Sequence, residues 1–75
     1  MERGEVLRVL REKAAVVLGV EDIAETAPLA QFDSLALVEL VMDLEDALGI
    51  ELPEQDVASA GTVGALVDLA VAKTS

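Results

Sequence analysis

The stretch FDSLALVELVMDLEDAL, residues Phe32 to Leu48, decides how this 75-residue chain folds. Its spacing predicts one helix, and Gly49 provides a natural end because glycine adopts the left-handed conformation at low cost. Five apolar side chains at helical spacing predict an inward stripe: Leu37, Leu40, Val41, Leu44 and Leu48. Three more form a second face, which we expect another protein to cover: Leu35, Val38 and Met42.

Asp33 and Ser34 stand at the front edge of this helix. Taken alone, the pair is typical of an N-cap, because either side chain can accept hydrogen bonds from free backbone amides. A catalytic serine is disfavoured, since the chain has no histidine to act as base and no Gly-x-Ser-x-Gly motif. A hydroxyl at a helix N-terminus also lies where free amides and the helix dipole favour an anion. A phosphodiester attached to this serine would be stabilised there, and a modifying enzyme would supply the base.

The composition excludes several classes of site. Without cysteine or histidine there is no disulfide framework, no thiolate nucleophile and no Cys/His zinc site. No loop has the alternating acids and glycine that calcium requires, so we expect no metal site. The length predicts a single domain over residues 1–75. The charged start MERGEVLRVLREK is unlike a signal peptide, and no apolar run approaches a membrane span, so we expect a cytoplasmic protein.

The charge is distributed unevenly along the chain. The formal net charge is −10, and no basic residue occurs between Ala14 and Ala72, whereas that span contains twelve acids. Such a surface repels nucleic acid and anionic membranes and favours encounter with proteins that carry basic patches. For acidic charge in general, a solvated surface is the simpler interpretation.

The rest of the chain predicts further helices around this one. Helical spacing covers Glu5 to Leu18, proline and acids favour a short helix from Pro53 to Ser59, and Thr62 can cap a last helix from Val63 to Ala72. Between the first two helices lies a long connection, residues 20–32, which we expect to be pinned to the core by Ile23, Leu29 and Phe32. The prediction is an all-α fold, a small four-helix bundle of three longer helices and a short third helix, with a long first loop.

Three segments of the chain together resemble a known family. Asp33-Ser34-Leu35, followed by VELVMDLEDALGIELP (Val38 to Pro53) and TVGALVDL (Thr62 to Leu69), looks like a freestanding acyl carrier protein. The resemblance covers nearly the whole chain. It implies a non-catalytic carrier whose Ser34 bears 4'-phosphopantetheine, added from coenzyme A by a separate transferase with magnesium, and whose Asp33 helps to position that serine. Acyl groups would be held on the arm as thioesters.

The resemblance also implies partners and a binding surface. The partners would be the phosphopantetheinyl transferase and acyl-loading and acyl-processing enzymes with basic docking patches, and the carrier would be a monomer. Their recognition surface would comprise Leu35, Val38, Glu39, Met42, Glu45 and Asp46. The cargo could fold back between the second and third helices, where the expected cleft lining is Leu40, Leu44, Val57 and Val63.

Three positions depart from the common family pattern. Gln31 replaces a frequent glycine, Ala36 replaces a frequent acid, and Leu37 makes the start of the helix unusually apolar. These departures favour a polyketide, hybrid or other specialised pathway over housekeeping fatty-acid synthesis. Two other interpretations remain open: a freestanding aminoacyl or peptidyl carrier, and an unmodified acidic helical interaction module.

Overall fold

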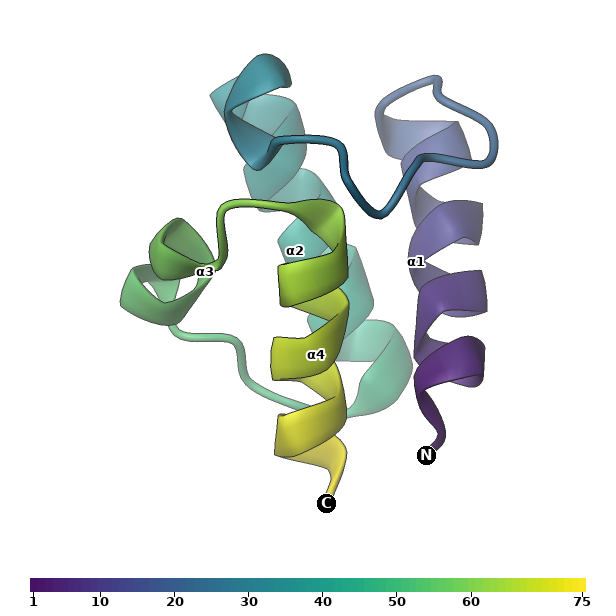
Figure 1. Cartoon of the computed structure of the whole chain (residues 1–75), viewed down its shortest axis with the longest axis vertical. Coiled ribbons are helices and arrows are strands. Elements are labelled where there is room, and N and C mark those ends of the chain that lie inside the picture. Colours follow the sequence, from purple (N-terminus) through teal and green to yellow (C-terminus); the bar gives the residue numbers. More distant parts are fainter.

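The computed structural model describes all residues 1–75 and contains four α-helices and one short 3-10 helix. Their bounds are α1 Arg3–Val17, η1 Leu29–Gln31, α2 Ser34–Leu48, α3 Glu54–Ala60 and α4 Val63–Thr74. α1 packs against α2 and α4, while the short α3 packs on α4 (Figure 1). The predicted all-α bundle with a long first loop is confirmed, and no helix is long and apolar enough to cross a membrane.

The predicted helix ends differ from the observed ones by one or two residues. α1 begins at Arg3 rather than Glu5, and α4 continues to Thr74 rather than Ala72. Pro53 was expected at the first helical position but is the N-cap of α3, with an extended ψ of 139°. This correction has a local cause, because a proline has no N–H and can stand just outside a helix as well as just inside it.

Both ends of α2 are closed by local chemistry. The Asp33 side chain accepts a hydrogen bond from the Leu35 backbone N–H at 2.8 Å. At the other end Gly49 adopts the left-handed conformation with φ 65°, and the Ile50 N–H donates to the Glu45 carbonyl at 3.1 Å. This is the Schellman-type ending that the Gly49-Ile50 pair predicts.

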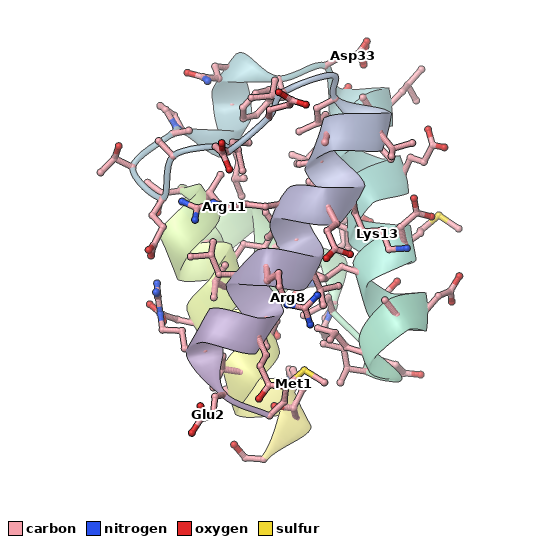
Figure 2. The ribbon with its side chains drawn as sticks, turned by 90° about the vertical axis from the view of Figure 1, so that its right-hand side faces the viewer. Met1, Glu2, Arg8, Arg11, Lys13 and Asp33 are labelled. Carbon is pink, nitrogen blue, oxygen red and sulfur yellow. The ribbon has the colours of Figure 1, made fainter.

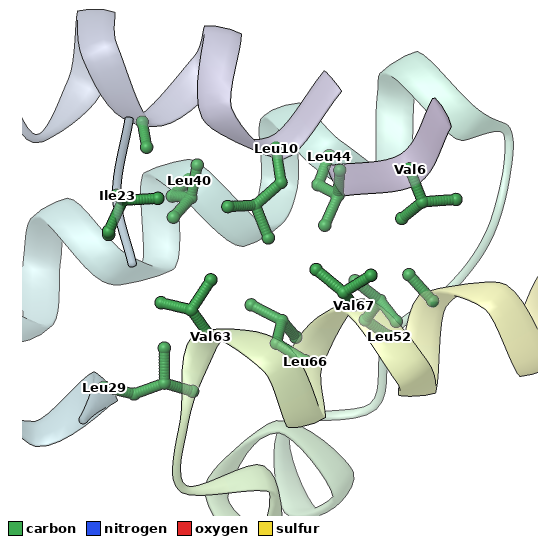
Figure 3. Packing of buried hydrophobic residues seen from close by; sticks show 12 residues of the cluster. Val6, Leu10, Ile23, Leu29, Leu40, Leu44, Leu52, Val63, Leu66 and Val67 are labelled. Carbon is green, nitrogen blue, oxygen red and sulfur yellow. The ribbon is translucent and has the colours of Figure 1, made fainter. Parts of the chain in front are cut away.

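One hydrophobic core lies between α1, α2 and α4 (Figure 3). The largest side chains buried in it are Val6, Leu10, Leu40, Leu44, Val63, Leu66 and Val67. Only Leu40 and Leu44 of α2 are buried; Leu37, Val41 and Leu48 of the predicted inward stripe are half-buried. The stripe is therefore narrower than its five-residue pattern predicts, because α2 packs extensively against α1 but only sparsely against α3.

The long first loop is pinned to the bundle by side chains and backbone bonds. Ile23 and Leu29 are buried and Phe32 is half-buried against the core, as predicted. The Val63 N–H donates to the Ala27 carbonyl at 3.0 Å, and Arg11 Nε donates to the Ile23 carbonyl at 3.1 Å. The loop thus carries the chain across one end of the bundle to the start of α2, at the end away from both chain termini (Figure 1).

An arginine clamp joins α1, the loop and α4. Arg3 forms ion pairs with Glu25 of the loop and with Asp68 of α4, the latter at 2.6 Å. The guanidinium hydrogen bond to Glu25 lowers the pKa of that carboxyl below its ordinary value. The Gly64 N–H donates to the Glu25 carbonyl at 2.8 Å, and a Cβ at this glycine would lie 3.2 Å from the same oxygen. The absence of a side chain at Gly64 therefore allows the loop to approach α4 closely.

Candidate functional site

In the Asp33-Ser34 pair, one residue caps α2 and the other presents a free hydroxyl. Asp33 is the N-cap of α2 and its carboxylate accepts the hydrogen bond from Leu35. Ser34 is the first residue inside the helix, is exposed, and its hydroxyl makes no hydrogen bond within the chain. The sequence left open which of the two residues caps the helix. Because the aspartate does so, the serine hydroxyl is free for chemistry with another molecule.

Ser34 differs in this respect from the other serines of the chain. The Ser59 hydroxyl donates to the Gln55 carbonyl at 3.0 Å, and the Ser75 hydroxyl donates to the Val71 carbonyl at 3.2 Å. Both of these residues lie in the later part of a helix or just after its end. Ser34 is thus the only serine that combines a free hydroxyl with the positive end of a long helix.

An open, mainly apolar groove of about 500 Å³ begins at Ser34 and runs between α2 and α3. Four α2 side chains form one wall: Leu37, Val38, Val41 and Met42. The opposite side comprises Leu52, Glu54, Val57 and Ala58, and Glu45 also borders the groove. A flexible arm attached at Ser34 would therefore start at the mouth of an apolar groove.

The predicted lining of this cleft is largely wrong. Of the four expected residues only Val57 lines the groove. Leu40, Leu44 and Val63 are at most 1% exposed and belong to the core between the helices. The residues that replace them are Leu37 and Val41 of the predicted inward stripe. They lie on its edge, where periodicity alone does not distinguish a core position from a groove position.

The second face of α2 is exposed as predicted. Leu35 is 80% exposed, Val38 56% and Met42 57%. Glu39 and Asp46 are also exposed, and no ion pair joins either of them to a basic side chain. Four of the five basic side chains lie on α1 instead; Arg8, Arg11 and Lys13 are labelled there in Figure 2, with Asp33 at the tip opposite Met1. Apolar and acidic side chains are therefore both available to solvent on α2.

Glu45 has an additional contact that the sequence did not reveal. Its Oε2 accepts a hydrogen bond from the Leu52 backbone N–H at 2.7 Å, and the side chain is half-buried. The two residues are seven positions apart, in a helix and in the following connection. Only knowledge of the path of that connection could have identified this pair.

These features fit a phosphodiester-linked prosthetic group. A free hydroxyl is the atom to which such a group is joined, and the helix N-terminus stabilises the negative phosphate. No basic side chain is needed at this end for that stabilisation. The adjoining groove offers apolar surface to whatever a flexible arm carries.

Comparison with known proteins gives a consistent result. Residues 8–70 match the family model described as the phosphopantetheine attachment site. The chain is 42% identical over 77 residues to the acyl carrier protein of Rubrobacter xylanophilus, covering 95% of this chain and 94% of that protein. It is 36% identical over 74 residues to the acyl carrier protein of Saccharopolyspora erythraea, covering 92% of this chain and 78% of the relative.

Members of this family are carriers rather than enzymes, and they work with a phosphopantetheinyl transferase and with biosynthetic enzymes. Their prosthetic group is covalent 4'-phosphopantetheine. With a family match over most of its length and near-complete coverage by the Rubrobacter relative, this chain belongs to the acyl carrier protein family.

Proposed function

We propose that Ser34 is the phosphopantetheine attachment residue and that the protein presents acyl thioesters to enzymes of a biosynthetic pathway. The observation that carries this proposal is the free, exposed Ser34 hydroxyl at the α2 N-terminus, beside the mouth of an apolar groove. The arm supplies a terminal thiol on which acyl groups are held as thioesters.

Asp33 and the first turn of α2 prepare Ser34 for this role. Because the Asp33 carboxylate binds the Leu35 N–H, it fixes the start of the helix and hence the position of the next residue. The Ser34 Oγ forms the bond to the phosphorus of coenzyme A that carries the pantetheine, a base of the transferase takes the hydroxyl proton, and the pyrophosphate bond breaks to release adenosine 3',5'-bisphosphate. The dipole of α2 stabilises the phosphodiester anion that remains on the serine.

The exposed α2 face is proposed as the recognition surface for partner enzymes. Leu35, Val38 and Met42 supply apolar contact area, and Glu39 and Asp46 supply negative charge. A partner with arginine or lysine around an apolar depression would complement this arrangement, and the charge would mainly speed encounter. Glu45 lies on the same helix but is partly engaged by Leu52, so its contribution to recognition is combined with a structural one.

The pathway is proposed to be a specialised one, such as polyketide or hybrid synthesis, rather than housekeeping fatty-acid synthesis. Ala36 and Leu37 support this proposal because they make the first turn of α2 less acidic and more apolar than is usual in the family. We further propose that the carrier acts as a monomer in the cytoplasm, where acyl-loading and acyl-processing enzymes would meet it.

Intact mass spectrometry tests the attachment residue. Co-expression with a phosphopantetheinyl transferase should add the mass of one phosphopantetheine group to the wild type and none to Ser34→Ala. Ser59→Ala is the matched control, since it removes an exposed hydroxyl that is already hydrogen-bonded, and it should be modified like the wild type. No addition to the wild type, or an addition that survives Ser34→Ala, would contradict the proposal.

A loading assay tests the class of cargo. The holo protein is offered in parallel to a malonyl or fatty acyl loading enzyme and to an amino-acid-activating enzyme. Charging by the acyl loader supports the proposal. Charging only by the amino-acid-activating enzyme would instead identify an aminoacyl carrier with the same arm and serine. An unmodified interaction module would already fail in the mass measurement, because it would yield no holo protein to charge.

A further inference from the structure

A single carboxylate joins the two sides of the groove at the end away from Ser34. Glu45 projects from α2, whereas Leu52 lies in the connection that leads into α3 and is 4% exposed. Both residues border the groove, and the Leu52 N–H donates to Glu45 Oε2 at 2.7 Å. This hydrogen bond therefore crosses from one wall to the other.

This bond lies at the far end of the groove, and its distance from Ser34 follows from the geometry of α2. At 1.5 Å per residue, Ser34 and Glu45 are separated by about 17 Å along α2. The groove residues between them recur at each turn of the helix, and those nearest the far end are Val41 and Met42. Glu45 thus stands at the end of the apolar α2 wall that is farther from Ser34.

The opposite wall makes few direct contacts with α2. α3 contains no fully buried residue and packs mainly on α4 rather than on α2. Its ion pair, between Asp56 and Lys73, is 3.8 Å long, partly exposed and also directed to α4. Exposed pairs of this kind contribute little. Val57 and Ala60 of α3 pack partly against the core, and the Leu29 N–H donates to the Gly61 carbonyl after α3. The Leu52–Glu45 bond is the one hydrogen bond that joins this wall directly to α2.

We propose that Glu45 is a positioning residue that acts as a latch. Its hydrogen bond to Leu52 fixes the α3 wall and the far end of the groove, and thereby limits the length of apolar cargo that the groove accepts. The part of this inference that concerns cargo rests on the proposed function of Ser34, whereas the part that concerns the latch does not.

Two substitutions at Glu45 separate its role as hydrogen-bond acceptor for the Leu52 N–H from the effect of its negative charge. Glu45→Gln retains an oxygen at the same distance from the backbone but removes the charge. Glu45→Asp retains the charge but shortens the side chain by one methylene, so that it no longer reaches Leu52. Asp46→Asn is the matched control, because it removes a charge from an exposed neighbour that makes no hydrogen bond to the groove.

Amide hydrogen exchange measured by NMR on the unmodified protein tests the latch directly. The Leu52 amide should exchange about tenfold faster in Glu45→Asp than in the wild type, because a bond to a charged acceptor is lost. Glu45→Gln and Asp46→Asn should stay close to the wild type, and the amides of α1 and α4 should be unchanged in all variants. Unchanged Leu52 exchange in Glu45→Asp, or equal acceleration in Glu45→Gln, would overturn the latch. Acceleration spread over the whole protein would show general destabilisation and would also overturn it.

Thioester hydrolysis on the loaded carrier tests the consequence for cargo. The wild type and Glu45→Gln, charged with a series of saturated acyl chains, should show protection that falls beyond a certain chain length. Glu45→Asp should lose this dependence on length. The same dependence in all three proteins would overturn the proposed role in cargo selection. If no phosphopantetheine is added to Ser34, the proposed function fails while the exchange experiment still decides the latch.

Discussion

The two sides of this bundle are held together in different ways. On the side of α1, the loop and α4, Arg3 pairs with two acids from separate elements, and Gly64 brings the backbones of α4 and the loop into contact. On the side of α2 and α3, one side-chain hydrogen bond spans an open groove, and three large apolar side chains face solvent. The first side therefore has several polar contacts between its elements and the second side has one, so we expect the second side to change its contacts more easily.

The largest effect on the free energy of unfolding is expected from a substitution in the core that both sides share. Leu66→Ala should lower the free energy of unfolding by about 3 kcal/mol, because it leaves a cavity at a fully buried position of α4. Leu35→Ala, on the exposed face of α2, should change it by less than about 0.5 kcal/mol. Urea denaturation followed by circular dichroism measures both. Similar losses in the two variants would mean that the α2 face is part of the folded core.

Two glycine substitutions test the close contact on the first side. At Gly4 a Cβ would meet nothing within 4 Å, so Gly4→Ala should stabilise α1 by about 0.5–1 kcal/mol through helix propensity. At Gly64 the new Cβ would press on the Glu25 carbonyl, and Gly64→Ala should be destabilising by about 1 kcal/mol. Thermal unfolding of the two variants should shift in opposite directions. A stabilised Gly64→Ala would show that the loop moves aside easily and that this side is not rigid.

A charge reversal on the exposed face of α2 tests whether that face binds partner enzymes. Glu39→Lys should raise the KM of the transferase for this protein several-fold, which corresponds to a loss of about 1 kcal/mol of binding free energy. The kcat and the folded state should be unchanged. Glu21→Lys is the control, because it makes the same change of net charge in the loop, away from the α2 face. Equal effects of the two substitutions would assign the influence to overall charge. Unfolding of Glu39→Lys in circular dichroism would assign the residue to the fold instead.

The smallest effect expected is the pH dependence of the stability that the arginine clamp contributes. The pKa of Glu25 is lowered by its bond to Arg3, so the clamp contributes stability above the ordinary Glu value of 4.5. This contribution is lost as the pH falls through the lowered pKa. The stability difference between wild type and Arg3→Gln should therefore be largest near neutral pH and vanish in acid, as measured by urea denaturation over pH 2–7. A difference that does not vary with pH would show that the clamp acts through packing alone.

The helices were predictable from the sequence because their signals are local. Asp33, Gly49 and Thr62 mark helix ends by their own chemistry, and the apolar period of α2 identifies its exposed face. The latch and the clamp were not predictable, because each pairs residues brought together by a loop. The groove lining was predicted wrongly at Leu40, Leu44 and Val63, since periodicity places a residue on a face but does not say which element covers it.

Localisation of the prosthetic group by fragmentation is the direct test that Ser34 carries the phosphopantetheine arm. The holo protein, made with coenzyme A and a phosphopantetheinyl transferase, is fragmented in the mass spectrometer, and the fragment ions on either side of Ser34 are compared. The chain offers six hydroxyl side chains: Thr26, Ser34, Ser59, Thr62, Thr74 and Ser75. The added mass should begin at Ser34. Its presence on any of the other five, or its absence from the chain, would contradict the account.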